Sequence, residues 1–504
     1  MRNPLAAKLL CIGLGSLLAS APGLARELHS HRISVVPEQP QQAQIERLLG
    51  RTQRGVAASE LAVAVRGGRA GVSLVTMFSA QQGSWPFEPF VHNGLFRAIA
   101  SYQAHHPRAV LVQGGRIDLA GLYRALGDER IMSRHKDGYL LSYPLLIGPD
   151  ASLDIADTTL YLRIHSGTAL INRGTLSLRR AVLTSWSGGQ PAELAQPFRP
   201  FVTAWAGSHT RILDSSLLRL GYNGQLVGGL TLARSALQPR GDAPATLLVR
   251  DSRLRELSSG AVLQQAVARI ERSHFDELQQ YGLDLQDSRA SLLDNRIAAV
   301  KNRSGIRLRG DSDGTLVEGN LILATGKAGI EVLEQRGALL VRGNLISDTR
   351  GNGILLRQSG GGVLLLAHNY IANTRGSGLE GDAAGTTFVL GNRINSTPEY
   401  AVSFRNAAGP PTHLVLLANQ FANVGKAMLR TEGVERMVLG HNRFQVGRNS
   451  QPLLAGDLMP VQSLLLEATV RQPCVVEVLA NTGAVQPPPQ TAGCQAEAPD
   501  GTAF

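Results

Sequence analysis

Two series of residues recur through the middle of this chain at intervals of about two dozen positions. Asparagines followed two positions later by an apolar residue are spaced 23 to 27 residues apart, at Asn295, Asn320, Asn344, Asn369, Asn392, Asn419 and Asn442. Glycines that open alternating apolar runs keep the same register, at Gly282, Gly305, Gly329, Gly353 and Gly378. Serines continue the first series upstream, at Ser273, Ser252 and Ser215. A repeat of this period indicates stacked units that bury one continuous core.

The segments between these residues are short apolar runs separated by Gly, Asp and Asn, which is typical of short strands and tight turns. Stacking would let each strand pair with its copies in the neighbouring coils, while inward Ile, Leu and Val fill the interior. The asparagines would satisfy backbone groups at one turn. We therefore predict an all-β fold over 136–450, a right-handed parallel β-helix with three-strand coils of about 24 residues. A leucine-rich solenoid would need a denser leucine pattern, which is absent.

The flanking regions differ from the repeat in texture. Residues 26–135 are predicted to form an N-terminal arm and an α/β cap for the first coil, with an extended arm up to about residue 90. Helical spacing of apolar residues recurs at 95–102 and at 119–126. Past 450 the repeat fades, so a last strand is expected at 461–470 within a C-terminal tail, 451–504.

The first 25 residues have the pattern of a secretory signal peptide. Arg2 and Lys8 precede an apolar run that is too short to span a bilayer, and small residues follow up to Ala25. No later run is long and apolar enough for a membrane span. Cys11 lies within the predicted signal peptide and would be removed with it. In an exported chain the two remaining cysteines, Cys474 and Cys494, favour a disulfide that fixes the tail, with two unpaired thiols as the alternative.

The formal net charge of +11 favours an anionic partner, although an arginine-rich soluble surface explains the same number. No nucleic-acid-binding motif is visible, so nucleic acid is not an expected partner. No cluster has the spacing of metal ligands, and we expect neither a metal nor a cofactor.

Three stretches resemble the periplasmic mannuronan C5-epimerases of alginate biosynthesis. They are residues 198–208, the Leu-Gly-Tyr of 220–222, and 281–287, which reads Tyr-Gly-Leu-Asp-Leu-Gln-Asp where the family has Tyr-Gly-Ile-Asp-Pro-His-Asp. With the coil register, the resemblance covers roughly residues 90–450. It implies a periplasmic protein that acts on an anionic polysaccharide of uronates, with a polysaccharide export complex as a further partner.

Inversion at C5 of a uronate requires a neutralised carboxylate, a base on one face of the sugar and an acid on the other. The resemblance implies catalytic positions at Tyr281, Asp284, Gln286, Asp287 and Arg309, and substrate-binding positions at Arg307, Trp205 and Tyr222. The family's basic His is replaced by Gln286, and an amide cannot accept a proton at ordinary pH. The family's Arg falls near Gly310, beside Arg309, which shares a strand face with Arg307.

Structural alternatives exist for each of these residues. Asp284 and Asp287 can be corner acids, Tyr281 can simply pack, and the two arginines can be solvated charges. Anchoring of the first coils is the favoured interpretation of the set Arg199, Trp205 and Tyr222. His274 is conceivable as a rescue base, but an exposed His beside a ladder residue is the favoured interpretation. Three functions stay open: epimerisation, binding or export assembly without turnover, and β-elimination by a lyase. Whether the chain is an enzyme is therefore left undecided.

Overall fold

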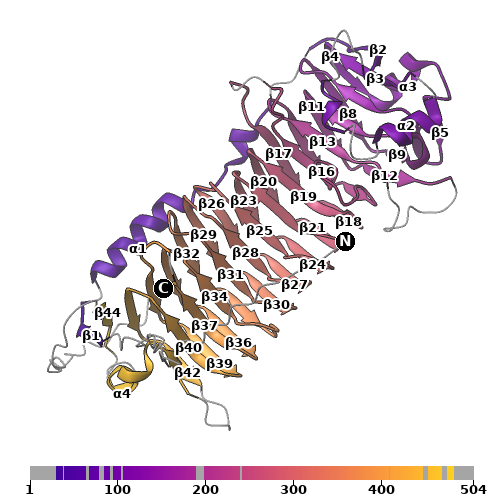
Figure 1. Cartoon of the computed structure of the whole chain (residues 1–504). Helices are drawn as coiled ribbons and strands as arrows, with labels where there is room; N and C mark the ends of the chain where they lie inside the picture. Colours follow the sequence, from indigo (N-terminus) through magenta and orange to yellow (C-terminus); the bar gives the residue numbers. More distant parts are fainter. Residues whose placement is uncertain are drawn as a thin grey trace, which may run out of the picture.

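The computed structural model describes residues 30–37, 39–63, 67–78, 85–90, 95–103, 106–188, 198–238, 241–407, 409–445, 452–467 and 474–481. Its strands form three long sheets that run the length of one solenoid (Figure 1). Consecutive coils add one strand to each sheet, and equivalent strands pair in parallel with the coil before and the coil after. This arrangement confirms the predicted parallel β-helix.

Sheet A consists, in spatial order, of β1 (Ser30–Val35), β44 (Val476–Asn481), β41 (Arg436–Gly440), β38 (His413–Leu417), β35 (Thr386–Leu390), β32 (Val363–Ala367), β29 (Ala338–Arg342), β26 (Thr315–Glu318), β23 (Arg289–Leu293), β20 (Ala266–Glu271), β17 (Ala245–Arg250), β14 (His209–Leu213), β11 (Thr175–Arg179), β8 (Ala151–Ala156) and β4 (Gly115–Asp118).

Sheet B consists of β2 (Gly71–Thr76), β3 (Arg108–Gln113), β7 (Leu145–Ile147), β10 (Leu170–Asn172), β13 (Val202–Trp205), β16 (Gly229–Ala233), β19 (Ser259–Gln264), β22 (Leu283–Gln286), β25 (Ile306–Arg309), β28 (Ile330–Leu333), β31 (Ile354–Arg357), β34 (Leu379–Asp382), β37 (Tyr400–Arg405), β40 (Ala427–Glu432) and β43 (Leu454–Gly456).

Sheet C consists of β42 (Arg443–Gln445), β39 (Gln420–Val424), β36 (Arg393–Thr397), β33 (Tyr370–Ala372), β30 (Leu345–Thr349), β27 (Leu321–Thr325), β24 (Arg296–Val300), β21 (His274–Leu278), β18 (Arg253–Arg255), β15 (Ser216–Leu218), β12 (Val182–Trp186), β9 (Thr159–Arg163), β6 (Gly138–Leu141) and β5 (Met132–His135). The inward Leu, Ile and Val of all three sheets form one continuous buried core.

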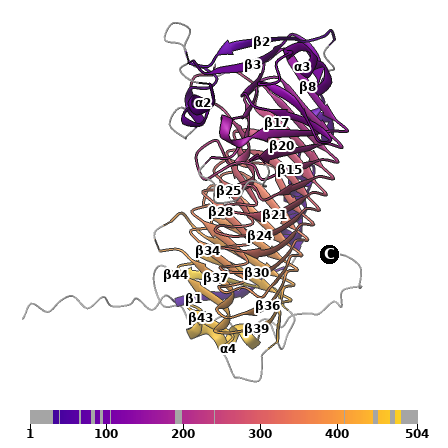
Figure 2. The ribbon, with the colours of Figure 1, turned by 90° about the vertical axis from the view of Figure 1, so that its right-hand side faces the viewer.

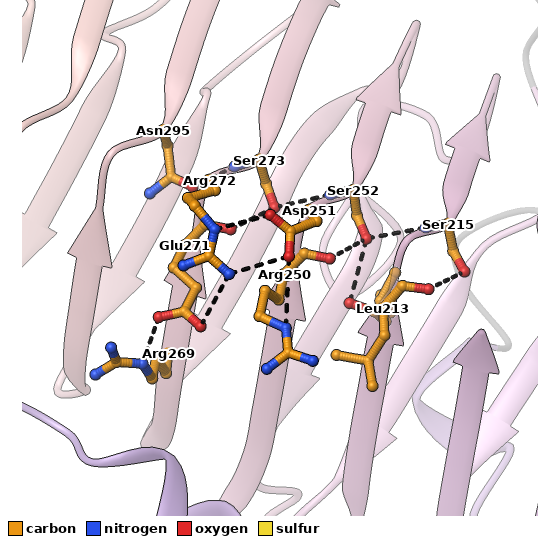
Figure 3. A network of polar contacts seen from close by, with 11 residues as sticks. Leu213, Ser215, Arg250, Asp251, Ser252, Arg269, Glu271, Arg272, Ser273 and Asn295 are labelled. Atoms are coloured by element: carbon orange, nitrogen blue, oxygen red, sulfur yellow. Dashed lines mark hydrogen bonds and ion pairs between the residues drawn. The ribbon is translucent and has the colours of Figure 1, made fainter. Parts of the chain in front are cut away.

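The predicted ladder follows one corner of the solenoid, between sheet A and sheet C. Figure 3 shows its serine end, where the backbone N–H of Ser252 donates to Ser273 Oγ at 3.2 Å, and the N–H of Ser273 donates to Asn295 Oδ1 at 3.0 Å. From Asn295 to Asn419 each backbone N–H donates to the side chain of the next ladder residue at 2.9 to 3.0 Å, and Asn442 is the last acceptor. The ladder therefore satisfies buried backbone groups coil by coil, as predicted.

The glycine series lies at the corner that leads into sheet B, where stacked turns approach closely. A Cβ on Gly282 would lie 2.3 Å from the carbonyl oxygen of Gly305, which nothing but glycine tolerates. The glycine series thus permits the close stacking of the turns from which the sheet B strands start.

The N-terminal segment runs back along the outer face of sheet A (Figure 1), from β1 at one end of the solenoid to β2 at the other (Figure 2). Strand β1 pairs antiparallel with β44 at one end of the solenoid, and β2 pairs antiparallel with β3 at the other. Between them lies α1 (Gln39–Thr52), where an extended arm with little structure was expected. Its Ile45 packs on an outward apolar column of sheet A made by Leu316, Leu340, Leu365, Phe388, Val415 and Val438.

The N-terminal cap contains the two expected helices, α2 (Leu95–Gln103) and α3 (Leu119–Leu126), together with the short helices η2 (Glu88–Phe90) and η3 (Ile164–Ser166). The short helix η1 (Ala58–Leu61) lies outside the cap, where its Leu61 packs on Leu248 of β17. Parallel pairing already begins within the cap, since β3 pairs with β7 and β4 pairs with β8. No helix in the described part of the chain is long and apolar enough to cross a membrane.

At the C-terminal end, the strand predicted for 461–470 is wrong. The described part of that stretch follows η4 (Met459–Val461) and folds as α4 (Gln462–Leu466), because Leu458 and Leu465 bury their side chains against the core end and cover the last coil. Cys474 is disulfide-bonded. Its predicted partner, Cys494, lies outside the described residues, as does the predicted signal peptide, 1–25.

Candidate functional site

The outer face of sheet B carries the motif that singled out residues 281–287. Along β22 and β25, Leu285 and Leu308 point into the core, while the alternate residues face outward. The register places Asp284 beside Arg307 and Gln286 beside Arg309, one coil further on. Predicted residues from two coils therefore meet on one face.

An open pocket with a volume of ≈ 260 Å³ lies on this face. Its walls come from the turn after β15 and from β16, β19, β22 and β25. Four predicted residues line it together: Tyr222, Tyr281, Asp284 and Arg307. The other lining residues are Asn223, Gly224, Gln225, Leu226, Gly228, Thr231, Ser258, Ser259, Val262, Gln264, Gln280 and Arg303.

Arg307 is the centre of the polar cluster in this pocket. Its Nε and Nη2 donate to the two carboxylate oxygens of Asp284, both at 2.7 Å, and its Nη1 donates to the Tyr281 hydroxyl at 2.6 Å. The guanidinium carbon also lies 4.1 Å from the centroid of the Tyr281 ring. This planar, bidentate arrangement is one that only arginine provides.

The environment fixes the protonation states of two members of this cluster. Burial works to lower the pKa of Arg307, but the hydrogen bonds and charge of Asp284 outweigh it, so the pKa lies above its ordinary value. Burial raises the pKa of Tyr281, against the opposing charge of Arg307. Tyr281 is therefore a neutral phenol at ordinary pH, suited to donating a proton and not to removing one.

Three predicted catalytic residues lie beside the pocket and do not line it. Gln286 is exposed on the same face. Arg309 pairs with Glu334, with Nε 3.3 Å from the carboxylate oxygen. Asp287 has a positive φ of 46° and accepts a hydrogen bond from the backbone N–H of Asp311 at 3.0 Å. This geometry supports the corner-acid interpretation of Asp287.

The upstream aromatic and basic residues serve mainly as anchors. Trp205 is 0% exposed beneath Trp85 and Phe90, so its position favours anchoring over the predicted sugar contact. Arg199 is equally buried and donates three hydrogen bonds to backbone carbonyls, those of Gly221, Leu220 and Glu256. Burial lowers its pKa to about 10.

Arg199 thereby holds the turn that delivers Tyr222 to the pocket. Gly221 has a φ of +75°, and a Cβ there would lie 2.2 Å from the backbone nitrogen of Gly229. Burial raises the pKa of Tyr222, so its phenol stays neutral. His274 belongs to β21 of sheet C, on another side of the solenoid, and does not reach this pocket.

Sequence reasoning missed Arg303, which lines the pocket from the turn before β25. Its guanidinium carbon is 6.0 Å from the Tyr281 ring centroid, and its side chain is exposed. Within the described residues its guanidinium makes no hydrogen bond or ion pair, whereas that of Arg307 is already engaged. The sequence feature that could have identified it is its position two residues before Gly305 of the glycine series, where the next coil has Lys327 before Gly329.

Chemically, the pocket offers one uncommitted guanidinium, one engaged guanidinium and two neutral phenols. Such a set can bind a carboxylate and protonate a neighbouring carbon. Among the described residues that line the pocket there is no histidine, and nowhere in the described ranges do three His, Cys, Asp or Glu residues gather as a metal site would require.

Comparison with known proteins extends this description. Residues 242–392 and 304–452 match the family described as the right handed beta helix region. The mannuronan C5-epimerase of Pseudomonas aeruginosa is 25% identical over 305 residues, which is 56% of this chain and 54% of that protein. Mannuronan C5-epimerase AlgG of Azotobacter vinelandii is 26% identical over 231 residues, 42% of this chain and 43% of that protein.

Among solved structures, the periplasmic alginate epimerase AlgG superimposes with a TM-score of 0.61 at 16% identity, covering 84% of this chain and 98% of that one. This likeness shows a common right-handed β-helical fold. By sequence, the chain spans about half the length of the curated relatives that it matches.

Proposed function

We propose that this chain, a homologue of the mannuronan C5-epimerases, binds a polyuronate on the outer face of sheet B and acts on it as an epimerase-type protein. The observation that carries the proposal is the hydrogen-bonded cluster of Tyr281, Asp284 and Arg307 in a surface pocket, at the motif positions. An anionic polymer also suits a chain of net charge +11.

The first requirement of C5 inversion is a neutralised carboxylate, because the negative charge left by proton removal must spread onto it. Arg303 is the residue we assign to this carboxylate, since its guanidinium has no acidic partner in the described structure and lines the pocket. Arg307 lines the same pocket, and its pair with Asp284 holds the guanidinium against Tyr281.

The second requirement is a pair of proton-transfer groups on opposite faces of the sugar. Tyr281, neutral and hydrogen-bonded to Arg307, is the residue we assign as proton donor. The donor's phenolate would be stabilised by the Arg307 guanidinium, whose Nη1 lies 2.6 Å from the oxygen. We assign no residue as the base that removes the C5 proton, because the motif position for a base holds Gln286.

Gln286 supports a second candidate function, polymer binding without turnover. An amide at the base position leaves carboxylate recognition intact and removes the proton acceptor. Such a protein would hold or guard an anionic polysaccharide during its export.

The compartment and the partners belong to the same proposal. We propose export through a signal peptide at 1–25 and a periplasmic location next to a polysaccharide export complex. Support comes from the sequence pattern of residues 1–25 and from the similar structure of the periplasmic alginate epimerase AlgG.

The deciding experiment is incubation of the purified chain with polymannuronate in D2O, followed by NMR of the C5 position. Deuterium at C5 together with guluronate signals is the expected result for an epimerase. Binding without exchange would identify the second function, and unsaturated chain ends would identify a lyase. A chain that neither binds nor alters polymannuronate would contradict the proposal altogether.

The substitution Gln286→His tests whether the base alone is missing. A positioned general base contributes about 10²–10⁴-fold, so we expect C5 exchange at least about a hundredfold above that of the parent chain. The control is Gln286→Asn, which keeps an amide and should leave exchange unchanged. Equal exchange in all three proteins would show that Gln286 does not occupy a base position.

A further inference from the structure

A second and larger pocket opens on sheet B, where the cap meets the first coils. Its volume is ≈ 640 Å³, and its walls come from β2, β3, β7 and the turn at Trp85. Four side chains give it polar and aromatic character: Trp85, Gln113, Asp150 and Arg173. Gln113 and Asp150 are exposed, whereas Trp85 and Arg173 are half-buried.

Arg173 is the most informative of these residues. Its side chain makes no hydrogen bond or ion pair within the described structure, and its guanidinium carbon lies 5.5 Å from the Trp85 ring centroid. Burial lowers its pKa, and the charge of Asp242 only partly compensates. A desolvated guanidinium without a carboxylate partner is costly, and a bound anion would relieve that cost.

The remaining groups fit a sugar better than a simple ion. The indole of Trp85 provides an apolar surface beside the cation, and Gln113 and Asp150 offer donors and acceptors for hydroxyl groups. Few polar groups around an apolar surface in a concave site are the usual features of a small-ligand site. A sugar that carries a carboxylate would use all four side chains.

The pocket lies on the same sheet as the first site. Leu146 in its wall and Thr231 in the wall of the first pocket occupy one outward column, which runs through Ile171 and Thr203. Three strand spacings separate Leu146 from Thr231, which is roughly 14 Å. Both pockets therefore face the side of the solenoid on which a polymer would lie.

We infer that the pocket around Arg173 and Trp85 is a second uronate-binding site, in which Arg173 binds the carboxylate of a sugar unit and Trp85 packs against its ring. The choice of sugar rests on the proposed function. The pocket holds a unit of the same polymer that the first site engages, and so increases affinity for long chains over short ones.

The test titrates the full chain with a short mannuronate oligomer and with a long one, by calorimetry. The unmodified chain should bind the short oligomer at two sites and the long oligomer more tightly. Arg173→Gln should leave one short-oligomer site and weaken the long oligomer by about tenfold or more. Trp85→Ala should weaken the same site, and a neutral mannose oligomer of equal length should not bind there.

The matched control is Arg124→Gln, which removes one exposed positive charge from α3 of the same cap and should change neither quantity. Unchanged stoichiometry and affinity in Arg173→Gln, with the fold intact by circular dichroism, would overturn the inference. If Arg307→Ala weakens binding while Arg173→Gln changes neither stoichiometry nor affinity, the proposed function stands and the second site falls. The opposite pattern would keep the second site and overturn the first, and no mannuronate binding at all would overturn both.

Discussion

The outer faces of sheet A and sheet B come from the same coils but have opposite characters. Over the central coils, the outward column of sheet A is Leu316, Leu340, Leu365, Phe388, Val415 and Val438, and α1 covers it. In these coils and the one before them, the outward column of sheet B includes Asp284, Arg307 and Glu331. Asp284 and Arg307 line the pocket, and Glu331 is partly exposed. Over these coils one face is closed by the chain itself, and the other stays open.

At the upstream end of sheet A, the outward side chains change where the segment that covers them changes. Where α1 ends, the outward column changes to Ser291 and Arg269, and both bind the backbone of Val56. The N–H of Val56 donates to Ser291 Oγ at 2.6 Å, and Arg269 Nη1 donates to the Val56 carbonyl at 2.9 Å. Outward residues of sheet A thus match the segment that packs on them, which indicates a structural face.

The largest expected effect comes from the covered face. Phe388 is 1% exposed, so Phe388→Ala should lower the free energy of unfolding by about 3–5 kcal/mol, through lost burial and the cavity left beneath α1. Chemical denaturation measures the change, and affinity for polymannuronate should stay as in the parent chain. Leu345→Ala, at a site 39% exposed on sheet C, is the control and should change stability by less than about 0.5 kcal/mol.

On the open face, Arg307→Ala should mainly lower the affinity for polymannuronate, whereas Phe388→Ala mainly lowers stability. Loss of the hydrogen bonds that hold Asp284 and Tyr281 in place should disorganise the pocket, so that affinity for polymannuronate falls by roughly tenfold to a hundredfold. The control is Arg342→Ala on sheet A, which breaks a comparable pair with Glu318 of the neighbouring coil. Equal losses of affinity in the two variants would erase the distinction between the faces.

The smallest effect is expected at Arg309, the next outward residue of β25 after the pocket residue Arg307. Arg309 and Glu334 are both 44% exposed, and exposed pairs contribute little because water and salt screen them. Arg309→Ala should therefore change stability by less than about 1 kcal/mol and polymer affinity by less than about fivefold. A loss as large as that of Arg307→Ala, measured by the same titration, would move the centre of the site along the strand.

Much of the scaffold could be predicted from the sequence because consecutive coils repeat the same requirement. Asn295 and its successors satisfy identical backbone groups at one corner, so spacing alone revealed them. The strands of sheet A read as unbroken apolar runs, as in 338–341, which is the signal of burial on both faces. That Ile45 of α1 supplies the cover could not be predicted, because the two segments are far apart in the chain.

The candidate site was predicted only in part for the same reason. Tyr281, Asp284 and Arg307 were found because a motif and the coil register placed them together. Trp205 was assigned to sugar binding by resemblance, but the fold places Phe90 and Trp85 over it. Such coverage by the cap leaves no periodic signal in the strands.

The central claim is that the open face of sheet B is the polymer-binding face, and a structure of the chain with a bound mannuronate oligomer tests it most directly. The account predicts an oligomer lying over β16 to β25, with a carboxylate within hydrogen-bonding distance of Arg303 and a sugar ring beside Tyr281. An oligomer bound along sheet A or sheet C, with the pocket at Arg307 empty, would contradict it.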